Sequence, residues 1–334
     1  SMVDGRTIVP LDFDWRDPNA RKGREGQLGQ LNFAHPDVQR LIAEDLKRRI
    51  AESPEARFWS VSPMAWASYD QSEQSRALDE REGTPMASLL TCVNVVAEAI
   101  GKEHPNIYIE TLASRWSRKP PKTIRPRDNV VIRLSTEGCY FFKRLDDPKC
   151  RANREFYQDL LAWSKVTPNL FVWDAVAHQG NFQTPFPNLQ VIQPDLKLFA
   201  AHNVKGVFAQ ASPYRGGELS ELRTYLLAKC LWNPNTDWEH TLNEFLDLYY
   251  KEGARFVREY IDLLTARAIE YGEAVDCLHD APWMDYNTVL DAELIFRRAF
   301  DLVQSEQVRK RLELAYLPVP VSYTHLRAHE TVLD

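Results

Sequence analysis

The sequence has 334 residues, enough for one barrel-sized domain or two ordinary domains. Its 44% hydrophobic and 26% charged residues are typical of a globular protein and exclude a disordered chain. A formal net charge of -6 argues against nucleic-acid backbone binding as the main role. No apolar run approaches the roughly 18–20 residues that span a bilayer. The five cysteines are scattered without metal-ligand spacing, and we interpret them as reduced.

Apolar runs alternate with helical patterns through the first two thirds of the chain. Each apolar run is short, as in a strand buried on both faces, and polar residues follow it. The expected strands are 58–62, 106–112, 129–134, 170–173 and 204–209. Apolar residues at helical spacing predict helices from Pro36, from Thr84-Pro85 to about Ile100, and over about 152–165.

The pattern changes after the last expected strand. From residue 218 onward the periodicity is helical throughout. The expected helices are 218–232, 237–250, 254–267, 288–302 and 306–317. We therefore predict an α/β fold: a partial (β/α)8 TIM-type barrel over residues 1–216, followed by a helical segment over 217–317 that packs on it.

Polar residues at the ends of the expected strands are the candidates for chemistry, because the loops after the strands of a parallel barrel carry its active site. Glycosidic cleavage needs one carboxylic acid and a second carboxylate. Glu137 and Asp174 follow neighbouring strands beside aromatic residues, which would raise a carboxyl pKa by desolvation. We expect Glu137 to be the general acid and Asp174 the base, nucleophile or substrate clamp. The alternative is that Asp174 caps a turn or pairs with an arginine, Arg133 or Arg115.

Other residues near the strand ends could bind a sugar. Aromatic rings could stack on a sugar face, arginines could hold a carboxylate, and polar groups could bind hydroxyls. The candidates are Trp66, Arg115, Trp116, Arg133, Tyr140, Trp173, His178, Asn181, Gln210 and Tyr214. Structural roles are open for the same residues: packing for the aromatic rings, an internal salt bridge for Arg133, and a loop-to-loop bond for His178.

Several motifs together resemble the family known as domain of unknown function 4838. They are Ser75 to Gly83, Arg118 to Lys122, Ile124 to Val130, Leu145 to Cys150, Val172 to Asp174, Gly206 to Phe208 and Glu218 to Pro234. The resemblance covers roughly residues 3 to 264. It implies a relation to glycoside hydrolases with (β/α)8 barrels, and the Leu-Trp-Asn-Pro motif is also similar to one in the xylan α-glucuronidases.

The sequence departs from the pattern of that family in two places. Members often carry Gln-Asn-Asp and then Cys-x-Cys-x-x-Cys around position 66, where this chain has Pro63-Met64-Ala65 and then Asp70, Ser72 and Ser75. They also often have Glu where this chain has Ala209. These departures argue against catalysis by the usual means of the family, and the lost cysteines argue against a metal site.

The two ends of the sequence are expected to be incomplete. Family members have more chain before this point, so the resemblance implies that the first barrel strands are missing. Residues 321–334 resemble a translated sequencing adaptor and are expected to be a non-native tail. No signal peptide is visible in this stretch of chain.

The sequence thus favours a carbohydrate-active hydrolase that acts on a glycan or sugar acid, with no metal, no cofactor and no nucleic-acid partner. The alternative is a degenerate, non-catalytic carbohydrate-binding barrel. An aldolase or lyase would need a reactive lysine or a metal cluster, and neither is evident. Substrate, stereochemical outcome, compartment and oligomeric state stay open.

Overall fold

The computed structural model describes residues 2–3, 6–7, 30–64, 68–212, 216–272, 275–278 and 281–330. Two short strands at its start, β1 (Met2–Val3) and β2 (Arg6–Thr7), pair antiparallel. Of the predicted site residues, Trp66 and Tyr214 lie outside the described residues.

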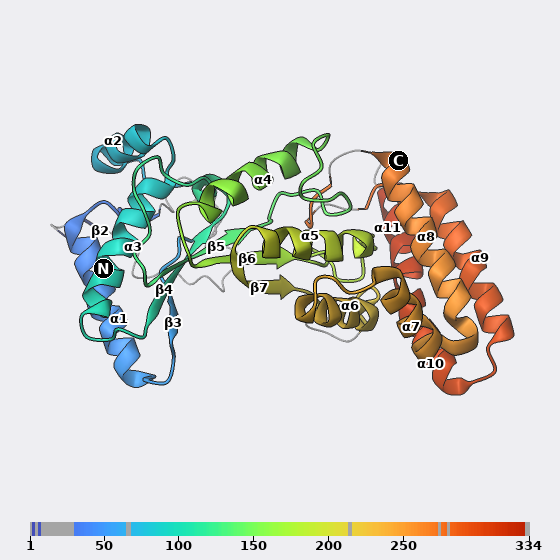
Figure 1. Cartoon of the computed structure of the whole chain (residues 1–334). Coiled ribbons are helices and arrows are strands. Elements are labelled where there is room, and N and C mark those ends of the chain that lie inside the picture. Colours follow the sequence, from blue (N-terminus) through green and yellow to red (C-terminus); the bar gives the residue numbers. More distant parts are fainter. Residues whose placement is uncertain are drawn as a thin grey trace. The chain divides into compact units, whose positions relative to one another are not determined.

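A five-stranded sheet is the centre of the α/β part (Figure 1). Its strands are β3 (Phe58–Ser60), β4 (Tyr108–Ala113), β5 (Val130–Ser135), β6 (Leu170–Ala175) and β7 (Val204–Gln210), and their order in the sheet is their order in the chain. β3, β4 and β5 pair in parallel. β6 continues in the same sense, because the amides of Ile132 and Thr136 donate to carbonyls of residues 169 and 173, both 37 positions on. The five expected strands are confirmed.

Helices connect most of these strands, as the alternating pattern predicts. They are α1 (Pro36–Glu52), α2 (Glu73–Glu82), α3 (Met86–Gly101), α4 (Arg151–Ser164) and α5 (Leu189–Ala201). Only the 3₁₀ turn η1 (Arg115–Ser117) lies between β4 and β5. The N-terminus of α1 is capped by the His35 side chain, which accepts from the Asp37 amide, and Pro36 occupies the first turn.

Helix α2 is an addition to the sequence-based expectation. Its ten residues are mostly charged and give no apolar stripe. The residues at its two ends define it instead. Ser72 caps its N-terminus by accepting from the Ser75 amide, and Gly83 ends it at φ 75°, a conformation that glycine adopts without strain.

The sheet is curled. Side chains alternate between its two faces, and Ile109, Ile132 and Leu134 on one face are fully buried. On the opposite face, the ring centroids of Phe58 and Phe171 lie 6.0 Å apart although β4 and β5 separate their strands. Rings three strands apart meet only across a concave surface. A curled parallel sheet with helices is the coarse architecture expected of a partial barrel.

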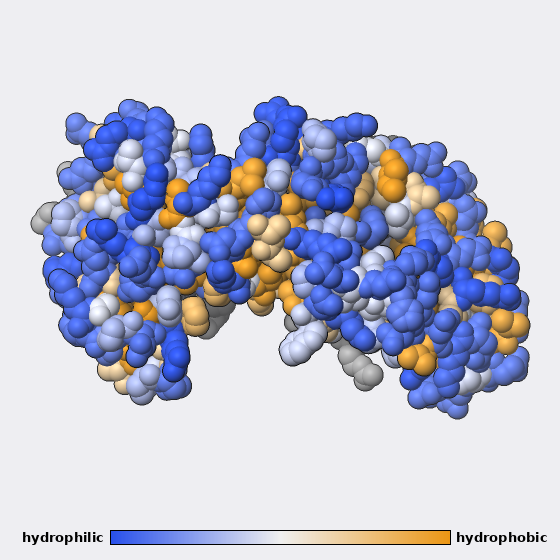
Figure 2. Space-filling view, in the orientation of Figure 1, coloured by the Kyte–Doolittle hydropathy of each residue, from blue (hydrophilic) through white to orange (hydrophobic). Residues whose placement is uncertain are grey.

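After the sheet, the described residues form helices and no further strand. The five expected helices are confirmed: α6 (Ser220–Trp232), α7 (Trp238–Tyr250), α8 (Ala254–Tyr271), α9 (Tyr286–Leu302) and α10 (Glu306–Tyr316). The turn η2 (Lys251–Gly253) precedes α8, and a further helix that was not expected, α11 (Pro318–Glu330), follows α10. Tyr250, Tyr260 and Phe296 are buried among them, and the Tyr260 and Phe296 rings meet edge to face at 5.0 Å. On the face seen in Figure 2, exposed residues of these helices are mostly hydrophilic.

The chain divides into two compact units, each described here by itself. The first comprises residues 1–135, 159–172 and 203–206, and the second comprises 136–158, 173–202 and 207–334. The predicted boundary at residue 216 and the predicted non-native tail stay predictions. In the described ranges no single helix is long and apolar enough to cross a membrane; α2 and α3 together reach that length and composition but meet at 103°.

Candidate functional site

The ends of β5 and β6 are joined by one threonine. Thr136, fully buried, donates its hydroxyl to Asp174 Oδ1 at 2.9 Å and accepts from the Ala175 amide at 3.2 Å. Its own amide donates to the Trp173 carbonyl at 3.0 Å. These three bonds fix the Asp174 carboxylate at the carboxyl end of its strand, as the sequence predicts.

The Asp174 carboxyl is only partly exposed, and this decides its protonation. Burial raises its pKa to about 6, while the hydrogen bond from Thr136 acts in the opposite direction. In turn, the charge of Asp174 helps to raise the pKa of Asp195, a buried carboxyl on α5 whose pKa burial already raises. Asp174 therefore faces the side of the sheet where α5 packs. It forms no ion pair with Arg115 or Arg133.

The thiol of Cys277 lies near both predicted catalytic residues. Burial raises its pKa to about 12, and the charges of Asp276, Glu137 and Asp174 add to the effect. The segment that carries Cys277 lies against the loop after β6, since the Gln179 amide donates to the Cys277 carbonyl at 2.7 Å. A Cβ added at Gly180 would approach the Leu278 carbonyl oxygen to 3.2 Å. The segment 275–278 thus packs on the loop after β6, within electrostatic reach of Asp174 and of Glu137.

Trp173 points to the opposite face of the sheet from Asp174, as strand alternation requires. Its indole Nε1 donates to Gln210 Oε1 at 2.6 Å, and its ring meets the Phe208 ring edge to face at 5.1 Å. Trp173 and Gln210, both predicted to bind substrate, therefore contact each other.

His178 and Asn181 form one turn in the loop after β6. The buried His178 ring accepts the Asn181 amide at Nδ1 at 2.8 Å. The Asn181 side chain in turn accepts from the Gln183 amide at 3.0 Å. The neutral His178 ring then carries its proton on Nε2.

A buried ion pair that sequence reasoning missed lies beside this turn. Arg223 on α6 donates to Glu218 and to the Asn188 side chain, and it also donates to the Phe186 carbonyl at 3.2 Å. Burial raises the pKa of Glu218, and Arg223 opposes this. With His178, the pair lines a cavity of about 10 Å³, room for one water. The sequence signal was a charged residue, Arg223, inside the leucine stripe of an amphipathic helix.

Tyr140, in the loop after β5, is buried, and its ring centroid lies 4.4 Å from that of Phe142. The remaining described candidates, Arg133, Trp116 and Arg115, belong to the first unit. Arg133 forms an ion pair with Glu110. Burial raises the pKa of Glu110, and the charge of Arg133 acts in the opposite direction. The Trp116 ring lies 5.4 Å from the Tyr69 ring. Arg115 has a positive φ of 48°, a strained conformation for a residue with a side chain.

Comparison with known proteins identifies the family of this chain. The family model named "Domain of unknown function (DUF4838)" matches residues 9–262, about three quarters of the chain. The chain belongs to the DUF4838 family. No curated protein matches it.

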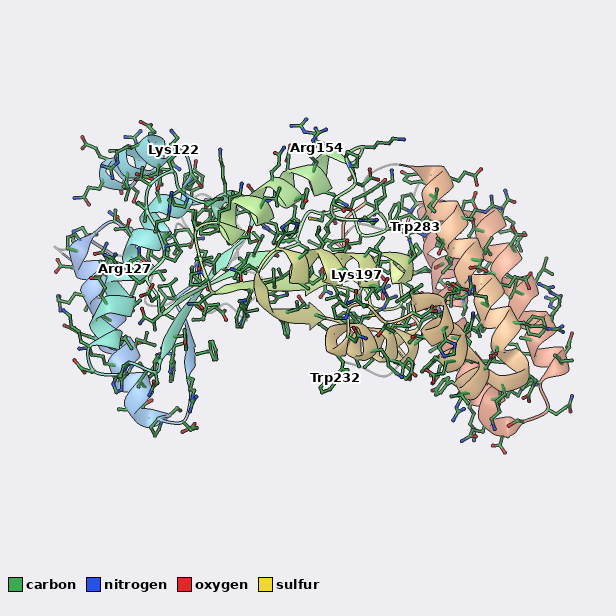
Figure 3. The ribbon with its side chains drawn as sticks, in the orientation of Figure 1. Lys122, Arg127, Arg154, Lys197, Trp232 and Trp283 are labelled. Carbon is green, nitrogen blue, oxygen red and sulfur yellow. The ribbon has the colours of Figure 1, made fainter. Side chains whose placement is uncertain are left out.

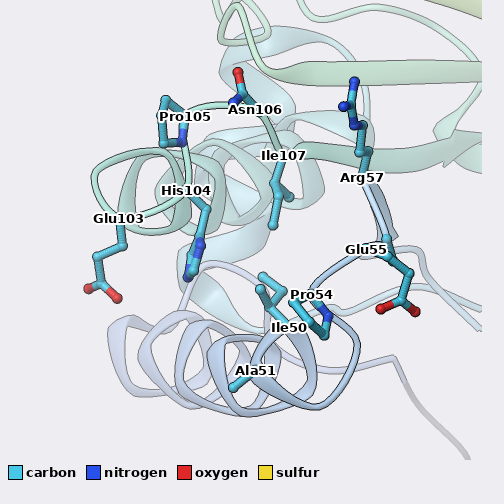
Figure 4. Close-up of a pocket in the computed structure, with 11 residues that line it drawn as sticks. Ile50, Ala51, Pro54, Glu55, Arg57, Glu103, His104, Pro105, Asn106 and Ile107 are labelled. Carbon is cyan, nitrogen blue, oxygen red and sulfur yellow. The ribbon is translucent and has the colours of Figure 1, made fainter.

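The matched DUF4838 region also contains a larger pocket, of about 570 Å³, at the other end of the strands (Figure 4). Ile50, Pro54 and Ile107 form its apolar wall, with Arg57 and His104 among its polar residues. It contains none of the predicted site residues. Arg57 and Ile107 directly precede β3 and β4, so this pocket lies at the amino ends of these two strands.

Within the described ranges of this DUF4838 chain, no group of three or more His, Cys, Asp or Glu side chains could hold a metal ion. The positions that depart from the cysteine pattern of the family bond to one another instead. The Ser72 hydroxyl donates to Asp70 at 2.6 Å, and the Ser75 amide donates to the Ser72 hydroxyl at 3.4 Å.

Proposed function

We propose that this DUF4838 protein is a carbohydrate-active hydrolase that cleaves a glycan or sugar-acid glycoside by carboxylate acid–base chemistry. The observation that supports it most is Asp174, a carboxyl held at a strand end by Thr136, whose pKa burial raises to about 6. A carboxyl that stays protonated near neutral pH can protonate a glycosidic oxygen. Asp174 is therefore the better candidate for the acid, which reverses the roles expected from sequence.

The test is turnover by two matched variants. Asp174→Asn and Glu137→Gln keep the shape of each side chain, and each is expected to lower kcat/KM on a cleaved chromogenic glycoside by about 10²–10⁴-fold. The control is Asp128→Asn, an exposed carboxyl with no role in this proposal, which should leave turnover unchanged. Circular dichroism checks the fold. Full activity of Asp174→Asn would refute the assignment.

The pH profile distinguishes the two roles of Asp174. If its protonated form is the acid, kcat/KM falls about tenfold per pH unit above the pKa of about 6. If its ionised form is the base, kcat/KM falls instead as the pH drops below that value. We expect the first profile, measured by initial rates between pH 4 and 9.

A second candidate is a carbohydrate-binding barrel without turnover. The departures from the family pattern favour it, because the carboxylates that members often carry at positions 65 and 209 are both alanine in this chain. Saturable glycan binding with no product from any chromogenic glycoside would support this alternative over hydrolysis.

A further inference from the structure

A second cavity, of about 460 Å³, lies between the loop after β5 and the start of α4. Three cations line it, Lys143, Lys149 and Arg151, against one carboxylate, Glu155. Glu155 already accepts from Arg151 at 2.9 Å. Among the described residues, neither lysine has a carboxylate within 4.0 Å. Two lysines thus line the cavity without a carboxylate partner among the described residues.

The wall of this cavity is rigid. The fully buried Asn153 accepts from the Tyr140 amide at 2.7 Å and donates to the carbonyls of Tyr140, Lys143 and Arg144, each at 3.0 Å. These bonds hold the loop in one conformation. The Lys143 ammonium lies 5.3 Å from the centroid of the Tyr140 ring, a cation–π contact that orients it. A preformed wall lowers the entropy cost of binding.

The surroundings of the cavity are hydrophilic on the visible face. Figure 2 shows hydrophilic colour over the start of α4, where Figure 3 labels Arg154. The protein as a whole carries a net charge of -6, so a local excess of cations is a specific feature of this place. Lysines and arginines bind carboxylate and sulfate groups.

The same loop carries Glu137, three residues before Tyr140. We infer that this cavity is a subsite for an anionic substituent, a carboxylate or a sulfate group, on the carbohydrate substrate. The inference rests on the proposed function, since it takes the substrate to be a carbohydrate that reaches Glu137. It narrows the substrate class to acidic glycans.

The test compares binding of three probes to the full chain by calorimetry: galacturonic acid, galactose and inorganic sulfate. Galacturonic acid is expected to bind at least tenfold more tightly than galactose, and its affinity should fall as NaCl is raised. The variant Lys143→Gln/Lys149→Gln should lose at least tenfold in affinity for galacturonic acid. Lys143→Arg/Lys149→Arg should retain it.

The matched control is Lys165→Gln/Lys197→Gln, which removes the same charge at two exposed sites elsewhere. Lys197 is labelled on α5 in Figure 3. Equal affinity for galacturonic acid and galactose, or equal losses in the two glutamine variants, would overturn the subsite. Sulfate binding as tight as galacturonic acid would make it a general anion site and overturn the link to sugar.

Failure of the subsite and failure of the hydrolase proposal give different results. Asp174→Asn should keep the preference for galacturonic acid while it loses turnover. Acid-selective binding without any turnover in the parent chain would refute hydrolysis and leave the subsite in place.

Discussion

The carboxyl of Asp174 is proposed to serve catalysis, and its ionised form lowers the stability of the fold. A carboxyl whose pKa is higher in the folded than in the unfolded state binds more protons when folded, so folding stability falls as pH rises between the two values. For Asp174 the interval runs from about 4 to about 6. The ionised group therefore destabilises the fold near neutral pH, as is common for residues kept for activity.

Asp174→Asn should accordingly stabilise the protein at pH 7.5 by up to about 3 kcal/mol, since one pKa unit corresponds to about 1.4 kcal/mol. The amide oxygen can still accept from Thr136. At pH 3, below both pKa values, the two proteins should be close to equally stable, because Asp174 is then largely protonated in the folded and in the unfolded state. Urea unfolding at both pH values measures this, with Asp128→Asn as the control. A variant that is less stable at pH 7.5 would contradict the assigned burial.

For this single residue, the sequence predicted the position at a strand end and a raised pKa, but not the cause of the raised pKa. The neighbouring Trp173, whose ring was expected to desolvate Asp174, lies on the other face of the sheet. The cause is burial on the face of the sheet where α5 packs. The packing of a strand end against a helix leaves no trace in the composition around the strand.

The loop after β5 is held in place by the side chain of Asn153. Asn153→Ala removes one acceptor and one donor that together serve four backbone groups of residues 140–144. Because these groups would be left buried and unpaired, we expect a loss of about 3 kcal/mol of stability. Urea unfolding measures the loss, and hydrogen exchange should quicken at residues 140–144. Asn235→Ala, at an exposed asparagine, should change stability by less than about 0.5 kcal/mol. Unchanged exchange in Asn153→Ala would contradict the anchoring role.

Elements with a strong apolar period could be predicted, and elements without one could not. Strands β3 to β7 and helices α3 and α6 to α10 were read from spacing alone. Helix α2 was missed because its capping residues, rather than an apolar face, define it. The Arg223 pair could have been suspected, but its partners Glu218 and Asn188 are set by the fold of the loops.

At the scale of the molecule, the sheet ends in two strands, β3 and β7, that have a neighbour on one side only in the described part of the chain. Strand edges of this kind pair readily with other chains. Phe208 on β7 is 49% exposed, which adds an apolar side chain to that edge. The expected consequence is association that grows with protein concentration.

Phe208→Lys should reduce this association, because a charged edge opposes strand pairing, while the lost contact with Trp173 costs about 1 kcal/mol. Light scattering over a concentration series measures it. Leu248→Lys is the control, since Leu248 is 71% exposed but lies on helix α7. If both variants reduce association equally, exposed apolar area rather than the strand edge is responsible.

All five cysteines are buried thiols. A thiol reacts with iodoacetamide only when it reaches solvent, so each modification rate reports how often the surrounding structure opens. Cys92 on α3 would report on the helices over the sheet, and Cys277 on the segment above Asp174. One alkylation time course, resolved by mass spectrometry, would therefore rank the regions of this molecule by how readily they come apart.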